Sequence, residues 1–297
     1  MTLHSSTWFI RLMPVLFVWL WSTGFIGAKY ALPYAEPFTL LLYRMLITLL
    51  ILSGLAWYLK PSWPDRRQMV HVAIVGLLVH GLYLGGVFYA ILGGMPAGLA
   101  SLIVGLQPLV TALMAVLILR ETVGTKQWLG LLLGLLGVSL VLLEKMGASE
   151  QLAGFPLWTV IWVLIALGAI SVGTVYQKRY CQNVQLIPGT LIQYCAAALF
   201  FLIGAAGFET GEVHWNQEFI WSMAWLVLAL SIGAILLLMA LIRQGAASQV
   251  ASLFYLVPPV TAFEAFILFD ERLGLLAMCG GILAVCGVAL VVMRKES

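Results

Sequence analysis

The chain has 297 residues, of which 63% are hydrophobic and only 9% are charged, with a formal net charge of +3. Soluble globular domains carry roughly 25% charged residues, and a water-soluble fold of this size could not bury so much apolar surface. The composition therefore excludes a soluble enzyme or binding module. It indicates an integral membrane protein, because lipid itself solvates apolar side chains.

The cysteines and the N-terminus carry no sign of metal binding or of secretion. Cys181, Cys195, Cys279 and Cys286 lie in or beside apolar segments and show no CxxC or Cys/His spacing. We interpret them as small packing residues and expect no metal site and no disulfide. Arg11 interrupts the first apolar stretch, which lacks a small-residue cleavage site, so we expect this stretch to be retained as a helix.

Ten apolar stretches follow one another along the chain, separated by turn residues rich in proline and glycine. A membrane-spanning helix needs about 20 mostly apolar residues, and the alternating ten-residue segments of a membrane barrel do not occur. We therefore predict an all-α integral membrane protein with ten transmembrane helices. They are expected near 9–30, 37–59, 68–92, 97–119, 126–143, 156–179, 187–208, 217–242, 248–269 and 273–293.

The basic residues predict the orientation of these helices. Cytoplasmic loops carry an excess of lysine and arginine, and ten spans put both termini on one side. With the N-terminus inside, the outer segments hold only Lys29, Lys145 and Arg272. We predict a multi-pass protein of the cytoplasmic (inner) membrane with both termini cytoplasmic. The eleven basic residues of the inner segments are Arg11, Lys60, Arg66, Arg67, Arg120, Lys126, Lys178, Arg179, Arg243, Arg294 and Lys295.

The two halves of the chain resemble each other. Residues 97–142 align without a gap on 247–292, a shift of 150 residues, with about a third of the positions identical. Because five spans is an odd number, the second copy must be inverted in the membrane, as in many transporters. We predict two inverted five-helix repeats, 1–146 and 155–297. Matched pairs include Pro108 and Pro258, Thr111 and Thr261, Glu121 and Glu271, Gly137 and Gly287, Ser22 and Ser171, Lys29 and Lys178, and Tyr43 and Tyr194.

Three motifs give the chain a resemblance to a known family. They are FVWLWSTGFIGAKYALPYAEPFTLLLYR, ASLIVGLQPLVTALMAVLILRE and its echo ASLFYLVPPVTAFEAFILFDERLG. The chain resembles the drug/metabolite transporter superfamily, specifically its EamA-type ten-helix members, over essentially its whole length. The resemblance implies export of amino acids, their derivatives, nucleobases, amines or drugs, and the outward direction rests on it alone. In the second repeat, Cys195 stands where the first has Arg44.

Two charged residues lie inside predicted spans, where charges are costly and commonly functional. Arg44 is about two turns into the second helix, and Glu264 is in the outer third of the ninth. Arg44 could anchor a substrate carboxylate, and Glu264 could bind a cation or a proton. The alternative is a structural ion pair between them, or an Arg44 side chain that reaches to the interface.

Polar and aromatic residues near the middle of the spans are candidates for solute binding. His80 with Tyr83 lies in the third helix, Gln107 precedes Pro108, and Tyr255 precedes a proline pair. A buried histidine could relay protons or only bond a neighbouring helix, and proline frees carbonyl groups that can face a cavity. Glu264 lies nine residues after Tyr255, which puts the two on nearly opposite sides of an ideal helix.

The first and sixth helices offer a second polar and aromatic set, Trp21 and Ser22 with Ser171 and Tyr176. Such a set suits an amphipathic solute, although small polar residues in membrane helices also serve close packing. Glu121 and Glu271 follow matching helices and have basic neighbours. They suggest ion pairs at a gate or a helix end.

We therefore expect an alternating-access secondary transporter that exports small amphipathic metabolites such as amino acids or derivatives. The alternatives are efflux of organic cations or toxic drugs, and a non-transporting membrane sensor. We expect no enzymatic activity, since no HExxH, GxSxG or paired-carboxylate pattern occurs, and no direct use of ATP, since there is no Walker motif. No cofactor, metal or nucleic acid is expected. The expected partners are a small-molecule solute, membrane lipid and, as a candidate, a proton, with a monomer as the working state.

Overall fold

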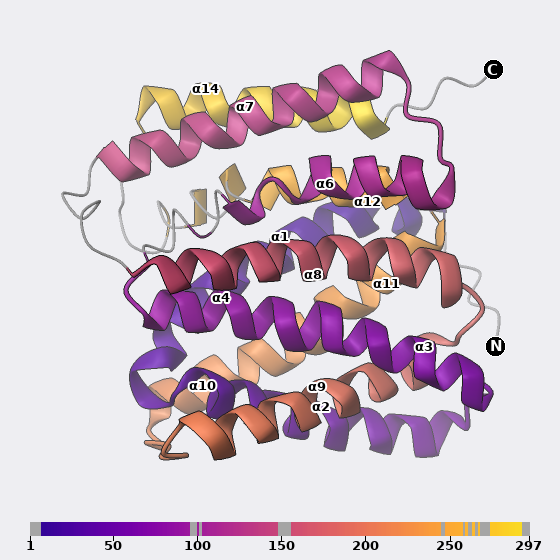
Figure 1. Ribbon diagram of the computed structural model, residues 1–297, viewed down its shortest axis with the longest axis vertical. Coiled ribbons are helices and arrows are strands. Elements are labelled where there is room, and N and C mark those ends of the chain that lie inside the picture. Colours follow the sequence, from indigo (N-terminus) through magenta and orange to yellow (C-terminus); the bar gives the residue numbers. More distant parts are fainter. Residues whose placement is uncertain are drawn as a thin grey trace.

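The computed structural model describes residues 7–95, 100, 103–147, 156–244, 247–257, 259, 260, 263, 264, 267 and 274–292. These residues form a bundle of helices that run side by side along one common direction (Figure 1). Five helical segments are long and apolar enough to cross a membrane: Pro37–Leu59, Arg66–Leu92, Leu157–Tyr180, Leu186–Phe208 and Gln217–Gln244. Shorter apolar helices accompany them at Leu12–Gly24, Gln107–Leu119, Thr125–Leu140 and Met278–Val291.

The helices follow the predicted spans closely, and the predicted all-α membrane fold is confirmed. The predicted spans 97–119 and 248–269 are described only in part, and of the predicted site residues Glu271 lies outside the described residues. Three segments are π-helical, η2 (Leu77–Leu82), η3 (Ala115–Leu119) and η4 (Leu226–Ala234). The other elements are α1 (Thr7–Ala31), η1 (Leu32–Tyr34), α2 (Pro37–Leu59), α3 (Arg66–Gly76), α4 (Tyr83–Leu92), α6 (Gln107–Met114), α7 (Thr125–Gly147), α8 (Leu157–Tyr180), α9 (Leu186–Phe208), α10 (Gln217–Trp225), α11 (Ile235–Gln244), α12 (Ala247–Ser252), η5 (Leu253–Leu256) and α14 (Leu275–Val292).

Local sequence explains where several of these helices begin. The Asp65 side chain accepts a hydrogen bond of 2.7 Å from the Gln68 amide at the start of α3. Asn216 does the same for Phe219 of α10 at 2.8 Å. Such caps satisfy amides that have no partner within the helix. Pro108, predicted to lie inside the span 97–119, falls in the first turn of α6, where proline removes no helical hydrogen bond.

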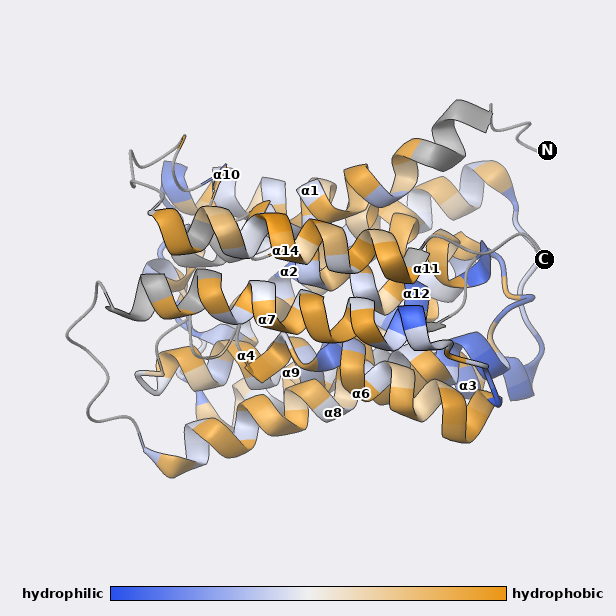
Figure 2. Cartoon of the chain, turned by 90° about the horizontal axis from the view of Figure 1, so that it is seen from above, coloured by the Kyte–Doolittle hydropathy of each residue, from blue (hydrophilic) through white to orange (hydrophobic). Residues whose placement is uncertain are grey.

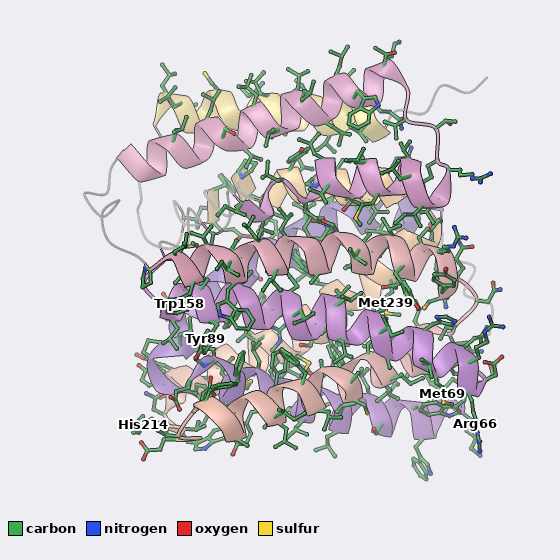
Figure 3. All side chains as sticks on the ribbon, in the orientation of Figure 1. Arg66, Met69, Tyr89, Trp158, His214 and Met239 are labelled. Atoms are coloured by element: carbon green, nitrogen blue, oxygen red, sulfur yellow. The ribbon has the colours of Figure 1, made fainter. Side chains whose placement is uncertain are left out.

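Hydropathy colouring shows that apolar residues cover the length of the bundle, while hydrophilic residues gather where α3 begins (Figure 2). Arg66 and Met69 lie at this end, and Tyr89, Trp158 and His214 lie at the opposite end (Figure 3). The end that carries Arg66 is the predicted cytoplasmic end. We call it the basic end.

Helices of the first half pack on helices of the second half in a crossed pattern. The helix α2 packs on α9, α6 on α12, and α7 on α14. The helix α1 packs on α10, η4 and α11, and α8 in the same way packs on α3, η2 and α4. When a two-fold axis relates two inverted repeats, a helix of the first repeat packs on helices of the second, and the equivalent helix of the second repeat makes the reciprocal contacts with the first. The arrangement is the one that two inverted repeats require.

Glycines let α7 and α14 approach along a seam that forms one edge of the bundle (Figure 1). A β-carbon on Gly130 would lie 2.5 Å from the Gly287 carbonyl oxygen, and one on Gly137 would lie 2.5 Å from the Gly280 carbonyl oxygen. Only glycine permits such an approach of two backbones. These glycines therefore hold the last helices of the two repeats together.

At the end opposite the basic end, two glutamates tie α2 to α9. The Glu209 carboxylate accepts hydrogen bonds from the amides of Phe38 at 2.7 Å and Thr39 at 2.6 Å, in the first turn of α2. In return, Glu36 accepts from the Thr210 amide at 2.7 Å and from its hydroxyl at 2.8 Å. We call this pair of contacts the glutamate clamp.

Candidate functional site

Five buried polar side chains from four elements meet inside the bundle. We call Arg44 of α2, His80 of η2, Gln193 and Tyr194 of α9, and Ser231 of η4 the central polar cluster; all are at most 6% exposed. The Arg44 Nε donates to the Ser231 hydroxyl at 2.7 Å, and His80 Nε2 lies 3.1 Å from Gln193 Oε1. The Tyr194 hydroxyl donates to the Ser231 carbonyl at 2.6 Å, and its ring lies 4.7 Å from that of His80. The cluster is one connected network.

The cluster is nearly symmetric between the two repeats. Ser231 follows His80 by 151 positions, and both lie in π-helical segments. Their partners Arg44 and Gln193 are 149 positions apart on α2 and α9. The cluster therefore consists of two related couples, Arg44 with Ser231 and Gln193 with His80, joined by Tyr194.

This arrangement corrects one pairing made from the sequence. Arg44, Met45 and Leu46 are buried, buried and exposed, and Gln193, Tyr194 and Cys195 repeat that order. Gln193, and not Cys195, therefore takes the place of Arg44 in the second repeat. Ungapped alignment missed this because the two helices are offset by two residues relative to their N-terminal prolines, and only burial reveals which residue faces inward.

The π-helical segments explain how the backbone joins this network. A π-helical turn breaks the regular hydrogen-bond ladder, and such turns often occur at functional sites. The Tyr194 hydroxyl donates to a carbonyl of η4 itself, that of Ser231. Both His80 and Ser231 are thus presented by irregular backbone that faces the protein interior, where such backbone is tolerated in a membrane.

Aromatic rings continue from the central polar cluster toward α1. The Trp21 ring is stacked on that of Tyr83 at 6.5 Å and meets the Phe254 ring edge-on at 5.2 Å. Tyr83 begins α4 and follows His80 by three residues, about one helical turn. The predicted solute-binding residues Trp21, His80 and Tyr83 are therefore brought together beside the central polar cluster.

Ser22 and Glu264 form a second polar contact. The Ser22 hydroxyl lies 2.6 Å from Glu264 Oε1 and also 2.6 Å from the Trp19 carbonyl oxygen. A hydroxyl has one hydrogen, so if it donates to Trp19, the hydrogen of the contact with Glu264 must come from the carboxyl group. The other carboxyl oxygen, Glu264 Oε2, is buried without a hydrogen-bond partner.

Arg44 and Glu264 are not joined to each other. Arg44 bonds Ser231, whereas Glu264 bonds Ser22. Tyr255 and Glu264 also face different helices, because the Tyr255 ring packs on Gly134 of α7 while Glu264 reaches α1. Their nine-residue spacing predicts this separation.

Further predicted site residues are buried with unpartnered polar atoms. Buried polar groups in proteins are nearly always hydrogen-bonded, so each exception needs an explanation. In the described part of the chain, the side-chain atoms without a partner are Gln107 Oε1 and Nε2, Thr111 Oγ1, Ser171 Oγ, Gln193 Nε2, Tyr255 Oη and Glu264 Oε2. They lie on α6, α8, α9 and the segment after α12.

Other predicted site residues lie away from this interior. The Tyr176 hydroxyl is 2.7 Å from His71 Nδ1, and His71 is stacked on Tyr180 at 4.8 Å. This group lies toward the end of α8 that carries its basic residues. Glu121 follows η3, where its amide donates to the Ala115 carbonyl at 3.2 Å.

Basic residues of α8 tie neighbouring helix ends together at the basic end. The Lys178 ammonium donates to the Ile242 carbonyl of α11 at 2.9 Å, and Arg179 Nη1 donates to the Ile118 carbonyl of η3 at 2.6 Å. Cations at helix C-termini satisfy carbonyls that lack a partner within the helix. These two hydrogen bonds therefore hold the ends of α11 and η3 against the end of α8.

Among the described residues, two grooves open on the outside of the bundle. One, of about 600 Å³, runs between α1 and α14 and is lined by apolar side chains such as Val15, Phe263 and Ile282. The other, of about 400 Å³, lies between α1 and α10 and combines Glu218 with Trp221 and Trp225. Neither is lined by a residue of the central polar cluster. Among the described residues, no three His, Cys, Asp or Glu side chains could hold a metal ion.

The sequence matches the EamA-like transporter family over residues 8–143 and again over 157–293. The chain belongs to this family, and it is a multi-pass membrane transporter of the drug/metabolite type. The two matched ranges correspond to the two repeats of the bundle.

Curated relatives and a solved structure agree with this assignment. An uncharacterized transporter of Bacillus subtilis, YvbV, is 30% identical, and the alignment covers 96% of this chain and 92% of that protein. A probable amino-acid metabolite efflux pump of Escherichia coli is 27% identical over 93% of this chain and 92% of the pump. A crystal structure superposes with a TM-score of 0.76 over 94% of this chain and 96% of the other, at 19% sequence identity. That likeness shows the fold.

Proposed function

We propose that the protein is an alternating-access exporter of small amphipathic metabolites, such as amino acids or their derivatives, across the cytoplasmic membrane. The observation that carries this proposal is the central polar cluster, whose two couples come from equivalent elements of two inverted repeats. A site built at the junction of two such repeats can be reached from either side as one repeat rocks against the other. The bonds of Lys178 and Arg179 suit a state closed at the cytoplasmic end.

The proposed class of solute follows from the interior and from the relatives. Trp21 and Tyr83 offer aromatic surface, and the central polar cluster next to them offers hydrogen bonds and a positive charge. Amphipathic solutes need both kinds of contact. Relatives named as probable amino-acid metabolite efflux pumps favour amino acids and their derivatives within that class.

Glu264 is the proposed proton site. It is buried, its contact with Ser22 is consistent with a protonated carboxyl group, and no basic partner for it is found among the described residues. A carboxyl group that binds and releases a proton in turn would couple solute export to proton entry.

Purified protein in proteoliposomes tests the proposal. Vesicles loaded with single labelled amino acids, and with or without a pH gradient, should release solute faster than protein-free vesicles. Equal release for every solute of the panel, with protein and without it, would contradict the proposal.

A second candidate is efflux of organic cations. The groove between α1 and α10 favours it, because Glu218 and three aromatic side chains, Tyr30, Trp221 and Trp225, suit a positively charged ring compound. The same vesicles loaded with a fluorescent lipophilic cation separate the two candidates. Cation efflux that E218Q abolishes, without any amino-acid efflux, would favour the second.

A further inference from the structure

Arg44 is a buried positive charge without a negative partner. Its side chain is 6% exposed, and no carboxylate among the described residues lies within ion-pair distance of it. The titratable side chains in and beside the central polar cluster, His80, Tyr83 and Tyr194, are neutral or cationic at physiological pH and supply no negative charge. A buried charge in a membrane protein is costly unless something compensates it.

The surroundings of Arg44 contain more hydrogen-bond donors than acceptors. A guanidinium group has five N–H donors, and the hydrogen bond found for Arg44 uses its Nε. The Gln193 amide contacts His80 through Oε1, while its Nε2 is buried, 1% exposed as a side chain, without a partner. Tyr194 links the Arg44–Ser231 couple to the His80–Gln193 couple, so the unused donors of Arg44 and Gln193 lie in one interior.

Both acceptor groups of Ser231 are already used by the protein. The Ser231 hydroxyl accepts from Arg44, and its carbonyl accepts from Tyr194. Planar, delocalised guanidinium and amide donors together match the two oxygens of a carboxylate. The stacked rings of Tyr83 and Trp21 lie about one helical turn from His80 and can hold the apolar body of the same molecule.

We propose that Arg44 and Gln193 bind the carboxylate of the transported solute, and that the substrates are therefore small carboxylate-bearing molecules. The proposal deepens the proposed function and rests on it, since it specifies which end of the solute this interior recognises. It also explains why the two couples differ: only the first repeat carries the positive charge, so one anion binds per transporter.

Paired ligands test the proposal without transport. The full chain in detergent is titrated with each amino acid and with its methyl ester, and the shift in melting temperature and the Trp fluorescence are followed. We expect amino acids to bind at least tenfold more tightly than their esters, the effect of one charge-assisted hydrogen bond of about 1.5–3 kcal/mol. R44Q should remove this preference. R44K should keep part of it, because lysine keeps the positive charge but loses the planar pair of N–H donors that matches a carboxylate. Equal binding of acid and ester by the wild type would overturn the proposal.

A carboxylate built into the protein gives a sharper test. In Gln193→Glu, the new carboxylate should pair with Arg44 and occupy the place of the ligand. We expect this variant to melt at a higher temperature than the wild type and to lose carboxylate binding. Gln185→Glu, the same change at the exposed start of α9, is the control and should bind as the wild type does. If Arg44 only supports the fold, Gln193→Glu will be stabilised and will still bind and export normally.

The outcomes separate this proposal from the proposed function. If the protein moves no solute in vesicles but binds acids in preference to esters, the proposed export is contradicted and the proposed carboxylate site is supported. Protein that exports amines or esters as fast as acids, with R44Q equally active, would keep export and overturn the carboxylate site. Should R44Q fail to fold, Gln193→Glu and the comparison of acid with ester in the wild type still decide whether Arg44 and Gln193 bind a carboxylate.

Discussion

At the scale of single residues, the charges of this protein break the symmetry between its halves. Arg44 and Gln193 occupy equivalent places, as do His80 and Ser231, yet in each pair one residue is a base and the other an uncharged amide or hydroxyl. The equivalent serines Ser22 and Ser171 differ instead in their partners. Ser22 bonds Glu264, whereas the Ser171 hydroxyl has no partner in the described structure. Symmetric backbones thus carry an asymmetric set of charges.

Glu264→Gln tests the proposed proton site. Glutamine keeps the oxygen that Ser22 approaches at 2.6 Å and nearly the same volume, so the variant should fold and bind solute as the wild type does. Because an amide does not take up and release a proton near neutral pH, export should no longer respond to a pH gradient. The measurement is solute efflux from vesicles with and without that gradient.

Asp65→Asn is the matched control for that experiment. It makes the same change of carboxylate to amide at the exposed cap of α3, where asparagine caps as well as aspartate. Its response to the gradient should equal that of the wild type. An undiminished response in Glu264→Gln would rule out Glu264 as the coupling group.

At the scale of helices, the glycine seam between α7 and α14 makes a prediction about stability. Gly130→Ala would place a methyl group 2.5 Å from the Gly287 carbonyl oxygen, so the backbones would have to separate. Overpacking of this kind costs about 1–3 kcal/mol. The melting temperature in detergent should fall.

Gly54→Ala serves as the control for the seam, because nothing lies within 4 Å of a β-carbon at that position of α2. There the change should be neutral or stabilising by about 0.5–1 kcal/mol, since glycine is the poorer helix former. Equal effects of the two substitutions would mean that the seam does not hold the helices together.

The glutamate clamp gives a second prediction at this scale. Glu209→Gln removes the negative charge that accepts two amide hydrogen bonds, at 2.7 and 2.6 Å, in the first turn of α2. A helix N-terminus favours such a charge, and we expect a loss of about 1–3 kcal/mol, measured as a fall in the denaturation midpoint. Glu212→Gln, in the same loop but exposed, should leave the midpoint unchanged.

The helices themselves could be predicted from the sequence, but the interior site could be predicted only in part. Apolar stretches of about 20 residues and turn residues between them locate the spans within a few residues. His80, Arg44 and Tyr83 stood out because polar groups in spans are rare. Gln193, Tyr194 and Ser231 were missed, although the 151-residue offset from His80 points to Ser231. The π-helical turns could not be foreseen, because they depend on packing between helices and not on composition.

At the scale of the whole molecule, the predicted orientation can be measured with single cysteines. Gln182→Cys, between α8 and α9, should react with a membrane-impermeant maleimide only when the reagent reaches the cytoplasmic side. Glu212→Cys should react from outside; both positions are exposed. The adjacent Cys181 should stay unlabelled at pH 7, since burial raises the pKa of its thiol to about 11 and leaves little reactive thiolate.

The opposite labelling pattern would reverse the topology. Labelling of both positions from one side would contradict a membrane-spanning α9, the one helix between them. Wild-type protein titrated to alkaline pH is the control for Cys181, whose reactivity should rise as its thiol ionises.

The crossed packing of helices has a consequence for how the protein is made. Each helix of the first half finds its main neighbour in the second half, as α2 does in α9 and α7 does in α14. A ribosome that has finished the first half has therefore produced a set of membrane helices whose partners do not yet exist. The Arg44 side chain therefore lacks its hydrogen-bond partner Ser231 until the second half has been synthesised. Two separately expressed fragments, 1–147 and 156–297, should consequently accumulate only when a cell makes both.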